Sequence, residues 1–398
     1  MDSVSLREVM QRHPSLREVV KAADRSEVCL VGGSVRDLLL GRVDGADVDV
    51  VVVGDAVQVA RDTAALLGAQ VSTHDRFGTA EIHLPDGRWI DLVSARRETY
   101  PVAGALPLVE PGTLDDDLAR RDITVNAMAI RLNGAEAGTI IDPCDGRRDL
   151  AARLVRVMHP ESFADDPSRV LRVARYAARL DFAVEATTRR AAERAAGDLD
   201  LTSARIAQEL VRTLQEPAAP AALAVAARLG VPWVVDTALI SGEFAAVGEA
   251  LATPAAPHVP EWALRLGIAV APRWLERDVA VEGWALSIAR AVPGARTLAG
   301  RLRGPMRMSQ VDDVLRSVPP PVTVAACAFG AEHVDAWWQA TAGLDLAVTG
   351  HDLIQAGISA GPQLGRGLAW LRAQVLDGAA PATREDQLAA VVDYIQER

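Results

Sequence analysis

Residues 31–53 read VGGSVRDLLLGRVDGADVDVVVV, and no other segment restricts the fold of this chain as strongly. The apolar residues 28–31 predict one strand, and the β-branched run at residues 47–53 predicts a second. Asp47 and Asp49 lie two positions apart on the second strand, so both carboxylates point to one face, with their Cα atoms about 6–7 Å apart. That spacing suits a pair of divalent cations, which stand about 3.5–4 Å apart in two-metal sites.

The turn after the first predicted strand has the features of a phosphate-binding loop. Gly32 and Gly33 have no side chain, so backbone amides there can approach a phosphate closely. Ser34 is the predicted N-cap of a short helix, whose positive dipole end adds to the attraction. Arg36 and Asp37 follow in that helix. A solvated strand end would explain an Asp-x-Asp pair that stood alone, but the preceding loop favours a phosphate-directed metal site.

Length and composition place the chain among globular proteins with two or three domains. Its 398 residues are 49% hydrophobic and 24% charged. No apolar run approaches the roughly 18 residues of a membrane span, and charges near the N-terminus argue against a signal peptide. Three scattered cysteines are too few for a disulfide framework or a cysteine zinc site. We therefore expect a cytoplasmic protein with no membrane partner.

The patterns of helix and strand predict three parts. Residues 1–150 alternate between the two, which predicts an α+β head with a small mixed sheet, including a helix over 56–67 and a hairpin over 79–94. Residues 151–216 are rich in Ala, Leu and Arg and predict a helical neck. Residues 217–398 follow a proline-rich break and predict a helical body and tail.

The net charge of −11 at first argues against a nucleic-acid partner, but its distribution is uneven. The predicted head carries a net −8, the neck +1 and the remainder −4. Residues 167–194 hold seven arginines and only three acidic residues. Such a local basic stretch allows an acidic protein to bind phosphate groups. The helices predicted in the neck are residues 167–179, 186–196 and 204–214.

The segment at 31–53 resembles the head of the class II tRNA nucleotidyltransferase and bacterial poly(A) polymerase family, within the DNA polymerase β superfamily. Four further motifs follow in the order of that family: RWIDLVSARRETY at 88–100, LARRDITVNA at 118–127, DDPSRVLRVARY at 165–176 and GHDLIQAGISAGPQLG at 350–365. The resemblance implies a polymerase β-like nucleotidyltransferase fold for the head, followed by an all-α neck, body and tail.

The resemblance also implies roles for matching residues. Asp47 and Asp49 are the implied metal ligands. Asp91 joins them in the catalytic set, either as a further ligand or as acceptor of the proton from the 3′-hydroxyl. The implied nucleotide-binding residues are Gly32, Gly33, Ser34, Arg36, Asp37, Arg121, Asp122, Asn126, Asp166, Arg169, Arg172 and Arg175.

Some of these roles also follow from chemistry, and each has a plainer alternative. Asp166 and Arg169 are three residues apart near a helix start, where a carboxylate and a guanidinium can bond the edge of cytosine or adenine. A solvated arginine face is the alternative for the stripe that continues through that helix. Arg121 suits a phosphate, with an ion pair to one of residues 115–117 as the alternative. Asn126 suits a ribose hydroxyl or a helix cap, and Asp91 could be a solvated strand edge.

The function implied is addition of C and A to the tRNA 3′ end from CTP and ATP, with release of pyrophosphate and no nucleic-acid template. Two Mg²⁺ ions are implied, with Mn²⁺ as the alternative. Asp165 stands where the family has Glu, and the connection at 98–120 is short, so full CCA addition and A-only addition both stay open. A bacterial poly(A) polymerase and a catalytically silent RNA-binding protein are further alternatives. The oligomeric state is left open.

Overall fold

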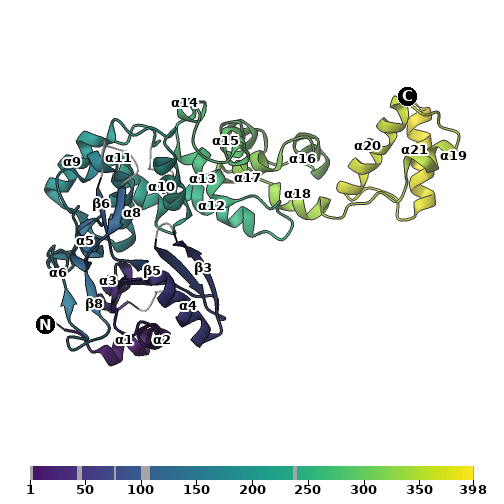
Figure 1. Cartoon of the computed structure of the whole chain (residues 1–398). Helices are drawn as coiled ribbons and strands as arrows, with labels where there is room; N and C mark the ends of the chain where they lie inside the picture. The colour runs from purple at the N-terminus through teal and green to yellow at the C-terminus, as the bar shows by residue number, and fades with distance from the viewer. Residues whose placement is uncertain (1–2, 43–46, 76–77, 100–107, 236–239, 398) are drawn as a thin grey trace. The chain divides into compact units, whose positions relative to one another are not determined.

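The computed structural model describes residues 3–42, 47–75, 78–99, 108–235 and 240–397 (Figure 1). Contacts divide the chain into two compact units. The first comprises residues 1–200 and 221–232, and the second comprises 201–220 and 233–398. The first contains a mixed sheet and the second is helical, which confirms the predicted fold class. Within the described ranges, no helix is both long enough and apolar enough to cross a membrane.

A seven-stranded mixed sheet forms the centre of the first unit, in the order β3-β4-β5-β2-β1-β8-β9. Only β2 and β5 pair in parallel, and all other neighbours are antiparallel. Both strands predicted from residues 31–53 and the predicted hairpin belong to this sheet. The strands are β1 (Glu27–Val31), β2 (Asp47–Val53), β3 (Gln70–His74), β4 (Thr79–His83), β5 (Trp89–Ser94), β8 (Ala129–Arg131) and β9 (Ile140–Ile141).

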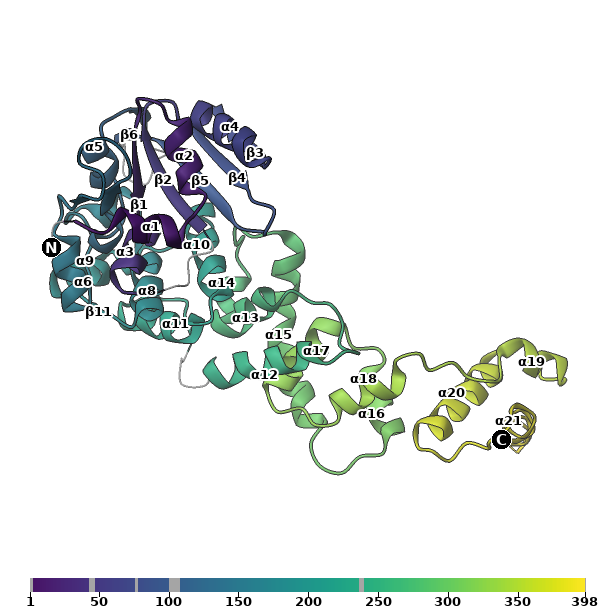
Figure 2. The ribbon, with the colours of Figure 1, turned by 90° about the horizontal axis from the view of Figure 1, so that it is seen from below.

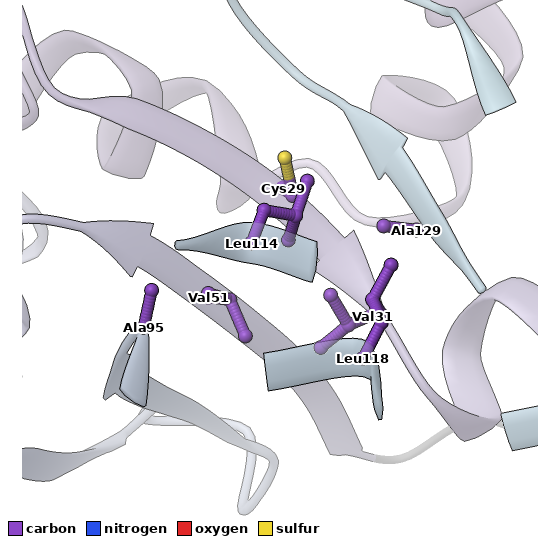
Figure 3. Close-up of a cluster of buried hydrophobic side chains, with 7 residues drawn as sticks. All are labelled: Cys29, Val31, Val51, Ala95, Leu114, Leu118 and Ala129. Carbon is purple, nitrogen blue, oxygen red and sulfur yellow. The ribbon is translucent and has the colours of Figure 1, made fainter. Parts of the chain in front are cut away.

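Helices cover the two faces of this sheet. On one face, α5 (Leu114–Ala119) inserts Leu114 and Leu118 into a buried apolar cluster. Figure 3 shows this cluster, which also contains Cys29, Val31, Val51, Ala95 and Ala129. On the opposite face, α4 (Ala56–Leu67) packs on β4 and β5 and against α2 (Leu16–Ala22). Because side chains alternate along a strand, Asp49 falls on the same face as Val51, the face covered by α5.

The remaining elements of the first unit surround this sheet. The predicted helix at 186–196 is α9 (Ala186–Ala196), and the helix predicted from 167 is α8 (Arg169–Leu180). The latter begins two residues late because Asp166 ends the preceding short helix and Ser168 is the N-cap of α8. The other elements are α1 (Leu6–Arg12), α3 (Gly33–Leu39), β6 (Arg96–Thr99), β7 (Leu108–Pro111), η2 (Thr124–Asn126), α6 (Gly146–Ala152), β10 (Leu154–Val155), α7 (Ser162–Asp165) and β11 (Ala183–Val184).

In the described part of the second unit, all regular elements are helices, apart from an isolated bridge between Val234 and Val270. Its C-terminal helices α19, α20 and α21 (Figure 2) share an apolar core that includes Leu353, Leu371 and Val391. Trp370 stacks on Tyr394 with ring centroids 4.8 Å apart. The helices from residue 204 onward are α10 (Ala204–Gln215), α11 (Ala219–Arg228, mostly in the first unit), α12 (Ile240–Ala252), α13 (Glu261–Ala269), α14 (Pro272–Leu275), α15 (Gly283–Arg301), α16 (Met308–Leu315), α17 (Pro320–Ala328), α18 (Val334–Thr341), α19 (Gly350–Gln355), α20 (Pro362–Leu376) and α21 (Arg384–Gln396).

Candidate active site

Two of the three predicted catalytic aspartates lie opposite each other in the sheet. Asp49 of β2 is the register partner of Asp91 of β5, and Asp47 is the partner of Trp89. Parallel neighbours in register project their side chains to the same face. The sequence places these carboxylates 42 positions apart, and the β2–β5 pairing brings them together. The side chain of Asp47, the first residue of β2, lies outside the described part of the structure.

The predicted phosphate loop packs directly on Asp49. Gly32 has φ +70°, and a Cβ there would lie 2.9 Å from Nη1 of Arg121 and 3.2 Å from Oδ2 of Asp49. Position 32 therefore requires glycine for both its conformation and its space. The hydroxyl of Ser34 accepts a hydrogen bond from the backbone N–H of Asp49 at 3.4 Å. The prediction that Ser34 is the N-cap of the following helix is wrong: α3 begins at Gly33 with Gly32 as its N-cap, and the Ser34 hydroxyl bonds the neighbouring strand instead. The loop and the catalytic strand thus form one local structure.

Arg121 lies beside this loop and is held from behind by Asp117. Its Nη2 donates to Asp117 Oδ2 at 3.0 Å, and its Nη1 donates to the carbonyl of Asn126 at 3.2 Å. Asp117 is fully buried and also accepts from Arg120 at 2.6 Å. The ion pair that was the alternative reading of Arg121 is thus present, and it places the guanidinium against Gly32 and Asp49.

The surroundings of Asp49 favour a bound cation. Burial raises the pKa of Asp49, while the charges of Arg121 and Arg36 oppose that shift. A carboxylate that burial destabilises gains from a nearby divalent ion, and carboxylate oxygens are ligands that Mg²⁺ prefers. Asp49 and Asp91 therefore fit a magnesium site. Among the side chains that the structure describes, which exclude that of Asp47, no group of three His, Cys, Asp or Glu residues forms a cluster able to hold a metal ion.

A second group of predicted residues is linked by hydrogen bonds around Arg36. This side chain is 4% exposed, and its Nη1 donates to Oδ1 of Asn126 at 2.6 Å. Its other edge makes two bonds to Asp37, at 2.9 and 2.8 Å. The amide nitrogen of Asn126 in turn lies 3.5 Å from Oδ1 of Asp122. These contacts orient the amide of Asn126 and engage its side chain with Arg36 and Asp122 rather than with a helix end.

The arginine stripe of α8 is partly buried. Arg169 and Arg175 are only 6% and 8% exposed, Arg172 is half-buried and Arg179 is exposed. Arg172 pairs with Asp122 at 3.5 Å. A solvated face accounts for Arg179 but not for the first two, because burying an arginine is costly unless it has partners.

The predicted template pair lies at the start of α8. Arg169 donates to the carbonyls of Ser162 at 3.3 Å and Arg120 at 3.5 Å. Asp166 accepts through Oδ1 from the backbone N–H and the hydroxyl of Ser168, at 3.0 and 2.6 Å. Arg169 also lines a cavity of about 190 Å³. The other residues lining that cavity are Arg97, Glu98, Asp116, Ala119, Arg120, His159 and Asp165.

Two residues of this region were not singled out from the sequence. Asp117 is the buried partner of Arg120 and Arg121, but the run Asp115–Asp117 does not reveal which of its three carboxylates is inside. Tyr176 lies under two arginines, with Arg175 at 4.8 Å and Arg36 at 5.6 Å from its ring centroid. The position of Tyr176 within a run of arginines could have indicated such cation–π contacts from the sequence.

Comparison with known proteins agrees with this geometry. Residues 28–156 match the family described as poly(A) polymerase head domain. The solved structure of a CCA-adding enzyme in apo form II superposes with a TM-score of 0.82 at 27% identity, covering 99% of this chain and 100% of that chain. Residues 28–156 of this chain are thus similar to that head domain, and the fold of the chain is similar to that of a CCA-adding enzyme.

The sequence relatives of this chain differ in the nucleotides that their names state. The chain is 44% identical over 164 residues to the A-adding tRNA nucleotidyltransferase of Halalkalibacterium halodurans, which covers 41% of this chain and 38% of that protein. It is 46% identical over 161 residues to the CC-adding tRNA nucleotidyltransferase of Deinococcus radiodurans, a match that covers 40% of this chain and 43% of that protein. The chain thus spans less than half the length of the curated relatives that it matches.

Proposed function

We propose that this protein adds C and A residues, as CCA or part of it, to the 3′ end of tRNA, using CTP and ATP and releasing pyrophosphate. No nucleic-acid template takes part. The observation that carries the proposal is the pairing of Asp49 with Asp91, directly beside the Gly32 turn and Arg121. Paired carboxylates next to a phosphate loop suit the transfer of a nucleotidyl group to a hydroxyl.

In the proposed reaction, Asp47 and Asp49 hold the divalent cations and Asp91 faces the attacking 3′-hydroxyl. Asp91 either supplies a further ligand or accepts the hydroxyl proton. We propose two Mg²⁺ ions, with Mn²⁺ as the alternative; when bound, they would neutralise charge on the triphosphate and lower the pKa of the hydroxyl. The nucleophilic oxygen bonds to the α-phosphorus, and the bond to the pyrophosphate oxygen breaks.

The neighbouring side chains would bind the incoming nucleotide. The guanidinium of Arg121 lies against Gly32, where it can bond phosphate oxygens in a bidentate manner. The fixed amide of Asn126 offers both a donor and an acceptor to a ribose hydroxyl. Gly33, Ser34, Arg36, Asp37 and Asp122 complete this side of the site.

We further propose that Asp166 and Arg169 select the base, with Arg172 and Arg175 contacting phosphate. The two bonds of Arg169 to backbone carbonyls are long, at 3.3 and 3.5 Å, so a base can replace them at little cost. The neck (151–216) would supply this template. The body and tail (217–398) would bind tRNA, and a cytoplasmic location is proposed because tRNA maturation requires its substrates there.

A-only and CC-only addition are the other candidates. The A-adding protein of H. halodurans is 44% identical over 164 residues, and the CC-adding protein of D. radiodurans is 46% identical over 161 residues. A bacterial poly(A) polymerase is a further alternative, which the length of the product distinguishes. A silent RNA-binding protein has no use for Asp47, Asp49 and Asp91 close together, where like charges repel.

The test is a mass measurement of products from three tRNA transcripts, ending before CCA, after C and after CC, each incubated with CTP, ATP and Mg²⁺. Extension of all three to CCA shows full CCA addition. Extension of the first two as far as CC shows CC addition, and extension of only the third shows A addition. Long A tails would show a poly(A) polymerase. If no transcript is extended but tRNA still binds, the protein is a catalytically silent RNA-binding protein.

A further inference from the structure

A small cavity lies beside the catalytic edge, and of the residues assigned above to the nucleotide it shares only Ser34 and Asp37. It has a volume of about 200 Å³. Four segments of the first unit enclose it: the end of α1, one side of α3, the residue Arg42 that follows α3, and the start of β5. The lining residues are Arg12, His13, Ser34, Asp37, Leu38, Arg42 and Arg88.

The charge of this cavity is positive. Arg12, Arg42 and Arg88 line it, and among the lining residues the one carboxylate is that of Asp37, which makes two bonds to Arg36. Arg12 forms an ion pair with Glu8 at 3.0 Å and donates to the carbonyl of Arg42 at 2.9 Å. The guanidinium of Arg88 uses Nε and Nη2 to bind Asp86, and that of Arg42 makes a long bond of 3.4 Å to the carbonyl of Leu180. A guanidinium carries five N–H donors, so these contacts leave donors for an anion.

His13 adds an independent sign of a missing ligand. Its Nδ1 is buried and has no hydrogen-bond partner among the described residues. Burial and the charges of Arg88 and Arg12 lower the pKa of His13, which favours its neutral imidazole. Buried ring nitrogens normally have a partner, and an anion held by the neighbouring arginines would supply one.

The position of the cavity distinguishes it from the nucleotide side of the site. Ser34, Asp37 and Leu38 are three and four residues apart and share one side of α3. Arg36, which bonds Asn126, projects from a different side of the same helix. Arg88 directly precedes β5 and stands three positions before Asp91, about 10 Å along the strand. The cavity therefore lies toward the strand whose carboxylate faces the attacking hydroxyl in the proposed reaction.

We propose that this cavity binds a phosphodiester group of the RNA strand near the 3′ end that is extended, through Arg12, Arg88 and His13. Paired guanidinium groups match the oxygens of a phosphate, and the volume suits a phosphate group rather than a whole nucleotide. The assignment to RNA rests on the proposed function. The site holds the strand in position and takes no part in bond making.

The test uses the full chain and a tRNA transcript ending in CC, without nucleotide, so that binding is measured apart from turnover. The double variant Arg12→Gln/Arg88→Gln should weaken tRNA binding by about tenfold, the effect of a lost charge-assisted contact. The plot of log affinity against log salt should become shallower, its negative slope decreasing in magnitude by about 0.7–0.9, as expected for the loss of one phosphate contact. The KM for ATP should stay unchanged. Arg61→Gln, which removes an exposed charge on α4, should change none of these values.

Thermal melting checks folding, and Arg12→Lys/Arg88→Lys should restore much of the affinity because it retains the charges. A raised KM for ATP with unchanged tRNA affinity would overturn the RNA assignment and give the phosphate to the nucleotide. Values equal to those of Arg61→Gln would show that the cavity binds no phosphate. A wild-type protein that binds tRNA through these arginines but adds no nucleotide would refute the proposed function and leave this site standing.

Discussion

Asp49 and Asp91 are register partners on the parallel strands β2 and β5. Neighbouring strands are about 4.8 Å apart, so two carboxylates on the same face at that separation repel each other unless a proton or a cation lies between them. Burial of Asp49 also raises its pKa, as repulsion by a second carboxylate does. A bound cation would therefore stabilise this pair of carboxylates, at the point where we place the metal ions.

Replacing Asp49 with Asn should reduce nucleotide incorporation by about 10³-fold or more, because the loss of a metal ligand removes stabilisation of charge in the transition state. Affinity for tRNA should persist. The measurement is single-turnover extension of a tRNA ending in CC, together with filter binding. Asp62→Asn removes an equal charge from an exposed site on α4 and serves as control. Near-native turnover of Asp49→Asn would refute the metal assignment.

Replacing Arg121 with Gln should shift the acidic limb of the pH–rate profile to higher pH. The charge of Arg121 lowers the pKa of Asp49, which burial has raised, so its removal leaves that pKa higher still. Because metal binding needs the ionised carboxylate, activity is then lost earlier as the pH falls. The profile of kcat/KM is measured at fixed Mg²⁺, with Arg61→Gln as reference. An acidic limb that does not move would show that Arg121 does not act on Asp49.

Replacing Asp117 with Asn should lower the free energy of unfolding by about 3 kcal/mol, since it leaves two partly buried guanidinium groups without their shared counter-charge. Asp115→Asn is the matched control. It lies on the exposed side of α5 and should change stability by less than about 0.5 kcal/mol. Urea unfolding measures both. Equal stability of the two variants would mean that Arg120 and Arg121 find other partners.

Replacing Asp166 or Arg169 with Ala should weaken discrimination among the four nucleoside triphosphates by about 5- to 150-fold, corresponding to about 1–3 kcal/mol for a bidentate base contact. Misincorporation of UTP and GTP into a tRNA ending in CC measures it. Arg179→Ala changes an exposed arginine of the same helix and should keep native selectivity. Reduced rates with unchanged selectivity would make the pair a scaffold for α8 rather than a template.

Local sequence patterns were sufficient for much of the fold. The helix at 56–67, the strand at 47–53 and the hairpin over 79–94 formed as predicted, because apolar periodicity and turn residues act over short distances. The same holds for the Gly32 turn, where the missing side chain is itself the functional feature. The strand β3 and the helix α2 were not predicted, because each is too short for its apolar residues to show a clear strand or helix period.

Other features depended on contacts between distant segments. No local pattern shows that Asp117, rather than Asp115 or Asp116, is the buried carboxylate, because that choice is made by the packing of α5 on the sheet. Spacing alone places the arginines of α8 on one face and does not distinguish a solvated face from a buried one with partners. Packing buries Arg169 and Arg175 and leaves Arg179 outside. Likewise, Arg12 and Arg88 line one cavity because the fold brings the end of α1 close to the residue that precedes β5. Strand register and helix packing bring residues far apart in the chain into contact, and the chemistry of this site depends on those contacts.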